Sequence, residues 1–197
     1  MSRVRRWAVW AGIVLLVASA IGCAAAQQLY VNPQADLTVY RKVAMLPMTN
    51  LTADRFASER VARALMTELI ATDRYQLVEP AELWSTLVAV GGEPGADGII
   101  RPEKLKEAAE KLGAQGVIRG AVTEYQLVRS GGGEVPQVGF DLEMIDVATG
   151  QVVWRTTVNT SGRGRVPIVG GPGLRSMGLV TQSACRRIVA QLKGRAL

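Results

Sequence analysis

The spacing of apolar residues changes once along this chain, and that change restricts the folds it can adopt. Up to Gly113, short continuous apolar runs are separated by segments in which apolar residues recur every three to four positions, as in a helix. From Val117 onward, apolar residues alternate with polar ones. The alternation is clearest over residues 138–144, where every second side chain is Val, Phe, Leu or Met. Because a period of two places neighbouring side chains on opposite faces of a strand, the second half predicts half-buried strands.

The predicted elements combine into a single α/β domain. We expect strands at 42–48, 75–78, 117–128, 138–144 and 152–158, and helices at about 55–72, 80–87, 102–112 and 174–193. Helical crossovers make the first strands parallel, and short turns make the last three an antiparallel meander. The predicted fold class is therefore a mixed sheet of about five strands packed with helices. Trp84 and Trp154 occupy apolar positions and are expected in the core.

The N-terminus has the pattern of a leader segment. Three arginines within the first six residues precede an uncharged run over residues 7–26, which ends in small side chains. A basic region, a short apolar region and small residues are typical of a secretory signal peptide. Residues 20–23, Ala-Ile-Gly-Cys, also resemble the lipobox of bacterial lipoproteins. That resemblance implies removal of residues 1–22 and attachment of a palmitate-type lipid anchor to Cys23.

Two other interpretations of the leader stay open: an uncleaved membrane anchor, because 20 residues can cross a bilayer, and ordinary signal cleavage. All three place the rest of the chain outside the inner membrane, since the arginines stay on the cytoplasmic side. Alanines after Cys23 resemble the sorting signal for the outer membrane, facing the periplasm. We therefore expect a lipidated N-terminus and short tether over residues 23–39, and a periplasmic domain over residues 40–197.

Composition excludes several kinds of site. The chain contains no histidine, and its two cysteines are Cys23 and Cys185. Serine or cysteine nucleophiles paired with histidine, and histidine- or thiolate-rich metal sites, are therefore excluded. Removing residues 1–22 takes away three arginines and no acids, so the formal charge falls from +6 to +3. This excess is too small and too scattered for nucleic-acid binding. We expect no metal and no cofactor.

The motifs that resemble ligand sites are better explained by loops and strands. Glycine clusters at 91–95, 131–133 and 162–173 lack both the Gly-Lys-Ser/Thr ending of a P-loop and the dinucleotide fingerprint. Asp141 and Glu143 share one strand face, but no third ligand accompanies them, so an ordinary polar face is expected. We therefore predict no catalytic and no cofactor-binding residue.

One loop carries a candidate contact. Arg163 and Arg165 directly precede the apolar residues 166–169 within the glycine-rich segment 162–173. The segment reads either as a flexible connector or as a contact for a protein partner or lipid headgroups. Both interpretations stay open.

Four blocks in order carry a family resemblance: 43–47 followed by Asn50, then 75–79, 112–120 and 146–154. Together they resemble the CsgG-type family of periplasmic lipoprotein domains, taken to include the curli secretion channel and peptidoglycan-synthase activator lipoproteins. The resemblance covers about residues 40–160. A transmembrane hairpin needs two strands of about 9–11 residues each, and the loops at 129–136 and 162–173 are too short for one, so no pore is predicted.

The leader, the resemblance and the lack of a catalytic constellation together predict a non-enzymatic, lipid-anchored outer-membrane protein. Its periplasmic domain is expected to bind envelope proteins, or further copies of itself, in envelope assembly or transport. An alternative is activation of a peptidoglycan synthase. A second alternative, from a different class, is an enzyme or small-molecule sensor built on the α/β sheet.

Overall fold

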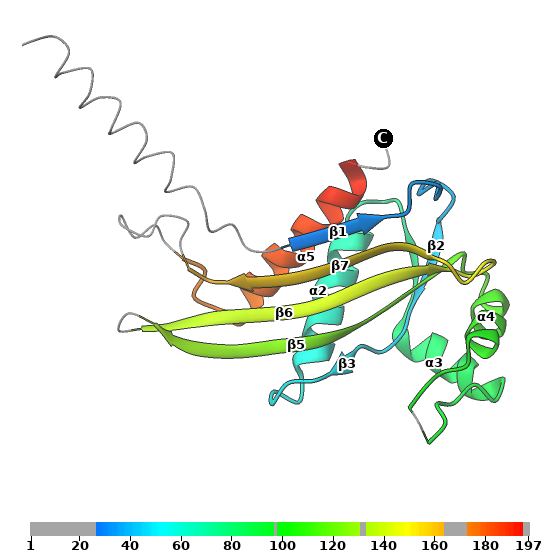
Figure 1. Cartoon of the computed structure of the whole chain (residues 1–197), viewed down its shortest axis with the longest axis horizontal. Coiled ribbons are helices and arrows are strands. Elements are labelled where there is room, and N and C mark those ends of the chain that lie inside the picture. The colour runs from blue at the N-terminus through cyan, green and yellow to red at the C-terminus, as the bar shows by residue number, and fades with distance from the viewer. Residues whose placement is uncertain (1–26, 97, 131–132, 164–172, 195–197) are drawn as a thin grey trace, which may run out of the picture.

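The computed structural model describes residues 27–96, 98–130, 133–163 and 173–194. In chain order the elements are β1 (Gln27–Val31), β2 (Lys42–Met45), β3 (Thr49–Asn50), α2 (Ala57–Ile70), β4 (Gln76–Val78), α3 (Pro80–Ala89), α4 (Pro102–Lys111), β5 (Gly116–Ser130), β6 (Gly133–Asp146), β7 (Val152–Ser161) and α5 (Met177–Gly194). The order confirms a single α/β domain (Figure 1).

The strands form one mixed sheet in the order β1-β7-β6-β5-β2-β4, with the short β3 beside β5. β2 runs parallel to β4 and β5, and β5, β6, β7 and β1 are successively antiparallel. The described sheet has seven strands rather than five, because β1 and β3 were not expected. β2 ends at Met45, before Pro47, which has no amide hydrogen to donate to a neighbouring strand.

The segment expected to be a tether belongs largely to the domain. Residues 27–31 form the edge strand β1, which pairs with β7 from Gln27 opposite Val158 to Val31 opposite Trp154. Leu37, farther along the same segment, is buried. An edge strand is held mainly by backbone hydrogen bonds, so its side chains need not follow the alternation that marks a central strand. Only residues 24–26 separate Cys23 from the sheet.

Helices cover the two faces of the sheet unequally, as Figure 1 shows. α2 and α5 lie together across one face, over the larger core, whose biggest buried side chains include Trp154 and Phe140. α3 and α4 cover only the β2–β4 end of the other face. Trp154 is buried as expected, but Trp84 is 37% exposed, because α3 turns Leu83 and Leu87 inward instead.

Among the residues that the structure describes, no helix combines the length and the apolar character that crossing a bilayer requires.

Candidate functional site

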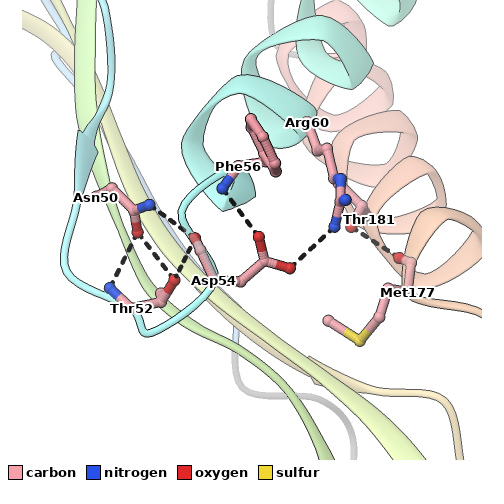
Figure 2. Close-up of polar contacts among 7 residues, drawn as sticks. All are labelled: Asn50, Thr52, Asp54, Phe56, Arg60, Met177 and Thr181. Carbon is pink, nitrogen blue, oxygen red and sulfur yellow. Dashed lines mark hydrogen bonds and ion pairs between the residues drawn. The ribbon is translucent and has the colours of Figure 1, made fainter.

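The turn between β3 and α2 is held in one conformation by its own polar side chains (Figure 2). The Asn50 Oδ1 atom accepts hydrogen bonds from the Thr52 amide, at 3.0 Å, and from the Thr52 hydroxyl, at 2.9 Å. The Asn50 side-chain amide donates to the Asp54 carbonyl at 2.8 Å. Asn side chains that bond the backbone two residues on stabilise such turns, so the start of α2 is fixed relative to the sheet.

Asp54 connects this turn to the first residues of α2. Its Oδ1 atom accepts the Phe56 amide hydrogen at 2.9 Å, and its Oδ2 atom pairs with Arg60 Nη1 at 2.9 Å (Figure 2). Phe56 is 43% exposed, and two arginine cations lie near its ring. The guanidinium carbon of Arg55 lies 4.4 Å from the ring centroid and that of Arg60 lies 5.8 Å away. Both distances fall in the range of cation–π attraction.

Beside Phe56, an open cavity of about 260 Å³ separates α2 from the start of α5. It is lined by Arg60, Ala64, Tyr125, Met177, Gly178 and Thr181. The Arg60 guanidinium carbon also lies 5.9 Å from the Tyr125 ring, so one arginine contacts both aromatic side chains. We call this cavity, together with the exposed Phe56 one helical turn before Arg60, the α2–α5 groove.

The chemistry of the α2–α5 groove suits binding rather than catalysis. Aromatic and arginine side chains are the residues that most often dominate the energy of protein–protein interfaces. The groove offers both, while Arg60 is paired with Asp54 and the Thr181 hydroxyl donates to the Met177 carbonyl. Within the described ranges no group of three or more His, Cys, Asp or Glu side chains could hold a metal ion.

The paired carboxylates weighed in the sequence do not form a site. Glu143 lies on β6 and accepts hydrogen bonds from Arg119 Nε at 2.6 Å and from Arg155 Nε at 2.8 Å. Burial disfavours the charged form of Glu143, but the hydrogen bonds from Arg155 and Arg119 outweigh it and lower the pKa of the carboxyl. Because both carboxylate oxygens are occupied by arginines, Glu143 joins three strands and is not available as a ligand or base.

The predicted contact residues are only partly within the described part of the chain. Arg163 is exposed at the end of β7, and its guanidinium donates a hydrogen bond to the Ser130 hydroxyl on β5. Cys23 and Arg165 lie outside the described residues. Sequence reasoning missed the α2–α5 groove. The available signal was Phe56, a large apolar residue off the buried stripe of the predicted helix.

A comparison with protein-family models matches residues 16–159 to the family described as peptidoglycan-synthase activator LpoB. The chain belongs to the LpoB family. This match spans most of the described domain and overturns the assignment to the CsgG-type family, for which no match supports membership. The four blocks quoted for that resemblance are mainly strand and turn segments. The resemblance grouped synthase activators with CsgG-type domains on these same blocks, so the blocks could not distinguish the two families.

Members of the LpoB family are lipoproteins of the cell envelope that activate peptidoglycan synthases and are not themselves enzymes. The expectation of a non-enzymatic, protein-binding role in the envelope is therefore confirmed, and the synthase-activator alternative is supported better than the general role in assembly or transport.

Solved structures share the fold at low sequence identity. The PelC dodecamer from Paraburkholderia phytofirmans is 22% identical, with a TM-score of 0.60, over 86% of this chain and 97% of that one. Lipoprotein GNA1162 from Neisseria meningitidis is 19% identical, with a TM-score of 0.53, over 78% of this chain and 99% of that one. The hypothetical protein CT253 from Chlamydia trachomatis is 18% identical, with a TM-score of 0.51, over 80% and 98%. A search of curated proteins finds no significant match.

Proposed function

We propose that this chain is an outer-membrane lipoprotein, acylated at Cys23 after removal of residues 1–22, that stimulates a peptidoglycan synthase by binding it through the α2–α5 groove. Family membership supports the partner class. The exposed Phe56, whose ring lies within cation–π distance of Arg55 and of the cavity-lining Arg60, is the observation that carries the choice of surface.

The groove is organised before any partner arrives. Asp54 fixes both the Phe56 amide and the Arg60 guanidinium, and Asn50 fixes the carbonyl of Asp54. A side chain that is already ordered loses little conformational entropy on binding, so more of its contact energy contributes to affinity. Arg55 and Arg60 favour acidic groups on the partner, and Phe56 favours apolar ones. The expected partner surface is therefore an acidic segment with an apolar anchor that enters the cavity.

Phe56→Ala tests this surface. Loss of an interface aromatic that dominates binding costs about 2 kcal/mol or more, so the dissociation constant for the synthase should rise about thirtyfold. The measurement uses purified lipoprotein in detergent, titrated against purified peptidoglycan synthases, with binding and glycan-polymerising rate followed together. Stimulation of the rate should decline in parallel with binding.

Trp84→Ala is the matched control, because Trp84 is an aromatic side chain of comparable exposure, 37% against 43%, on the helix pair at the other end of the sheet. It should bind and stimulate as the wild type does. Wild-type binding by Phe56→Ala, or an equal loss in both variants, would contradict the assignment to the α2–α5 groove. Sedimentation velocity of the same preparation tests whether the lipoprotein binds further copies of itself, which is the other kind of partner expected from the sequence.

A further inference from the structure

We propose that the outer end of the β5–β6 hairpin rests on the anionic phospholipid surface in which the lipid anchor sits. The proposal rests on acylation of Cys23 as part of the proposed function. We call this region the hairpin end. It consists of Leu127, Arg129, Glu134, Arg163, Leu174 and Arg175.

The first argument is the position of β1. The chain enters the sheet at Gln27, which lies opposite Val158 on β7, and Val158 in turn lies opposite Phe140 on β6. Because β1 is antiparallel to β7, it starts at the end of the sheet where β7 finishes and where β5 turns into β6. Figure 1 shows the start of β1 and the far end of the β5–β6 hairpin on the same side of the molecule, with the hairpin extending farther.

The second argument compares two lengths. Four residues lead from Gln27 back to Cys23, and at about 3.3–3.6 Å each they reach at most about 14 Å. Seven residues of β6 lead from Phe140 out to Gly133, which is about 23 Å at a rise of about 3.3 Å per residue. The hairpin therefore extends about 9 Å beyond the farthest point that the Cα atom of Cys23 can reach along the strands. When the strands point toward the bilayer, the hairpin end therefore contacts the lipid headgroups, either end-on or with the hairpin lying flat on the membrane surface.

The third argument is the chemistry of the hairpin end. Its side chains carry three arginines against one acid, and Leu127 and Leu174 are 51% and 37% exposed. The end is also one structural unit. Arg163 donates to the Ser130 hydroxyl, the Gly162 amide donates to the Pro136 carbonyl at 2.8 Å, and a Cβ at Gly162 would lie 1.9 Å from the Leu174 carbonyl oxygen.

Arginine beside exposed leucine suits the boundary between phosphate groups and acyl chains, since the guanidinium binds phosphate while the apolar stems and leucines face the hydrocarbon. Basic residues near an anionic leaflet also act as a second membrane signal beside a lipid anchor. The short distance from Cys23 to the sheet and the positive charge of the hairpin end both favour the membrane surface as its binding partner. In this orientation, the sheet face that α3 and α4 leave uncovered is exposed to the periplasm.

The test measures which end of the domain approaches the lipid. A fluorescent label is placed at Gly133→Cys, where a Cβ meets nothing within 4 Å, or at Ser85→Cys on the exposed side of α3. Cys185 is buried and does not compete for the label. The full-length lipoproteins are reconstituted into vesicles containing anionic phospholipid and a headgroup-level quencher lipid. Quenching should be at least about threefold greater at position 133 than at position 85.

Charge reversal separates membrane contact from mere proximity. Arg129→Glu, Arg163→Glu and Arg175→Glu together should reduce quenching at position 133 to the level at position 85. The matched control reverses three lysines of α4: Lys104→Glu, Lys106→Glu and Lys111→Glu. That control should leave quenching unchanged, and vesicles of neutral lipid should quench position 133 less.

Mass spectrometry of each preparation distinguishes the two ways of failing. An acylated Cys23 with equal quenching at positions 133 and 85 would overturn the membrane contact and leave the anchor standing. An unmodified Cys23 would overturn the anchor and the contact together. Label-to-label quenching at position 133 in detergent, without quencher lipid, would mean that a second copy covers the hairpin end and would also overturn the proposal.

Discussion

At the residue scale, two glycines let the central strands of the sheet approach closely. A Cβ on Gly120 would lie 2.1 Å from the Asp141 carbonyl oxygen, and one on Gly139 would lie 2.6 Å from the Asn159 side-chain oxygen. Both positions flank the irregularity between Val122 and Glu124, where the register of β5 shifts against β6. The glycines are therefore required by space at the point where the hairpin bends.

Gly120→Ala should lower the free energy of unfolding by about 3 kcal/mol, because the methyl group can be accommodated only by moving the β6 backbone. Urea unfolding of the chain without residues 1–23, followed by tryptophan fluorescence, measures the change. Gly133→Ala in the same hairpin is the control and should change stability by less than about 0.5 kcal/mol, since nothing lies within 4 Å of its Cβ. Equal effects at the two positions would refute the steric explanation.

At the element scale, one row of side chains ties three strands across the open face. Arg119 on β5, Glu143 on β6 and Arg155 on β7 are register partners, and the carboxylate accepts hydrogen bonds from both arginines. The arginine side chains are 48% and 60% exposed and that of Glu143 only 11%. The two arginine side chains therefore cover the Glu143 carboxylate, and its negative charge is paired with positive charge rather than buried alone.

This row makes stability depend on pH. The pKa of Glu143 is lowered below its ordinary value of 4.5, so its contribution is fully present above about pH 4.5 and is lost as pH falls through the lower folded pKa. Glu143→Gln should lower the free energy of unfolding by about 1 kcal/mol at pH 7. The difference from the wild type should vanish in acid. Urea unfolding at several pH values measures it, and a difference independent of pH would contradict the ion-pair explanation.

At the scale of the whole molecule, the sheet separates two cores, and the α2–α5 side holds the larger one. Cys185 is fully buried there. Burial, reinforced by the nearby Glu68 carboxylate, raises the pKa of the Cys185 thiol to about 12. The thiolate needed for alkylation is therefore scarce until the domain opens.

Alkylation of Cys185 should report opening of the domain. At pH 8 the folded protein should react with iodoacetamide at least about a hundredfold more slowly than a free thiol, and the rate should rise with urea along the unfolding curve. Intact-mass measurement follows the reaction, with unfolded protein as the positive control. Rapid labelling of the native protein would show that α5 opens independently of the rest.

Much of the fold was predictable because its patterns are local. The alternation over residues 138–144 and the apolar stripe around Leu65 each depend on neighbours within a few positions, and those segments became β6 and α2. β1 was missed because an edge strand at Gln27–Val31 depends on backbone pairing with β7, more than a hundred residues later. The prediction that Trp84 is buried was wrong because the buried face of α3 is formed by Leu83 and Leu87 instead.

The sequence by itself determined the absence of histidine chemistry and the order of the helices and of the five strands β2 and β4 to β7, since each follows from residue type or short-range period. Only the tertiary structure decided which side chains meet in the α2–α5 groove. Arg60 meets Tyr125 and Met177 because α2, β5 and α5 pack together, and no spacing along the chain encodes that meeting. It also decided how near Cys23 lies to the sheet along the chain, because pairing of β1 with β7 leaves three residues between them.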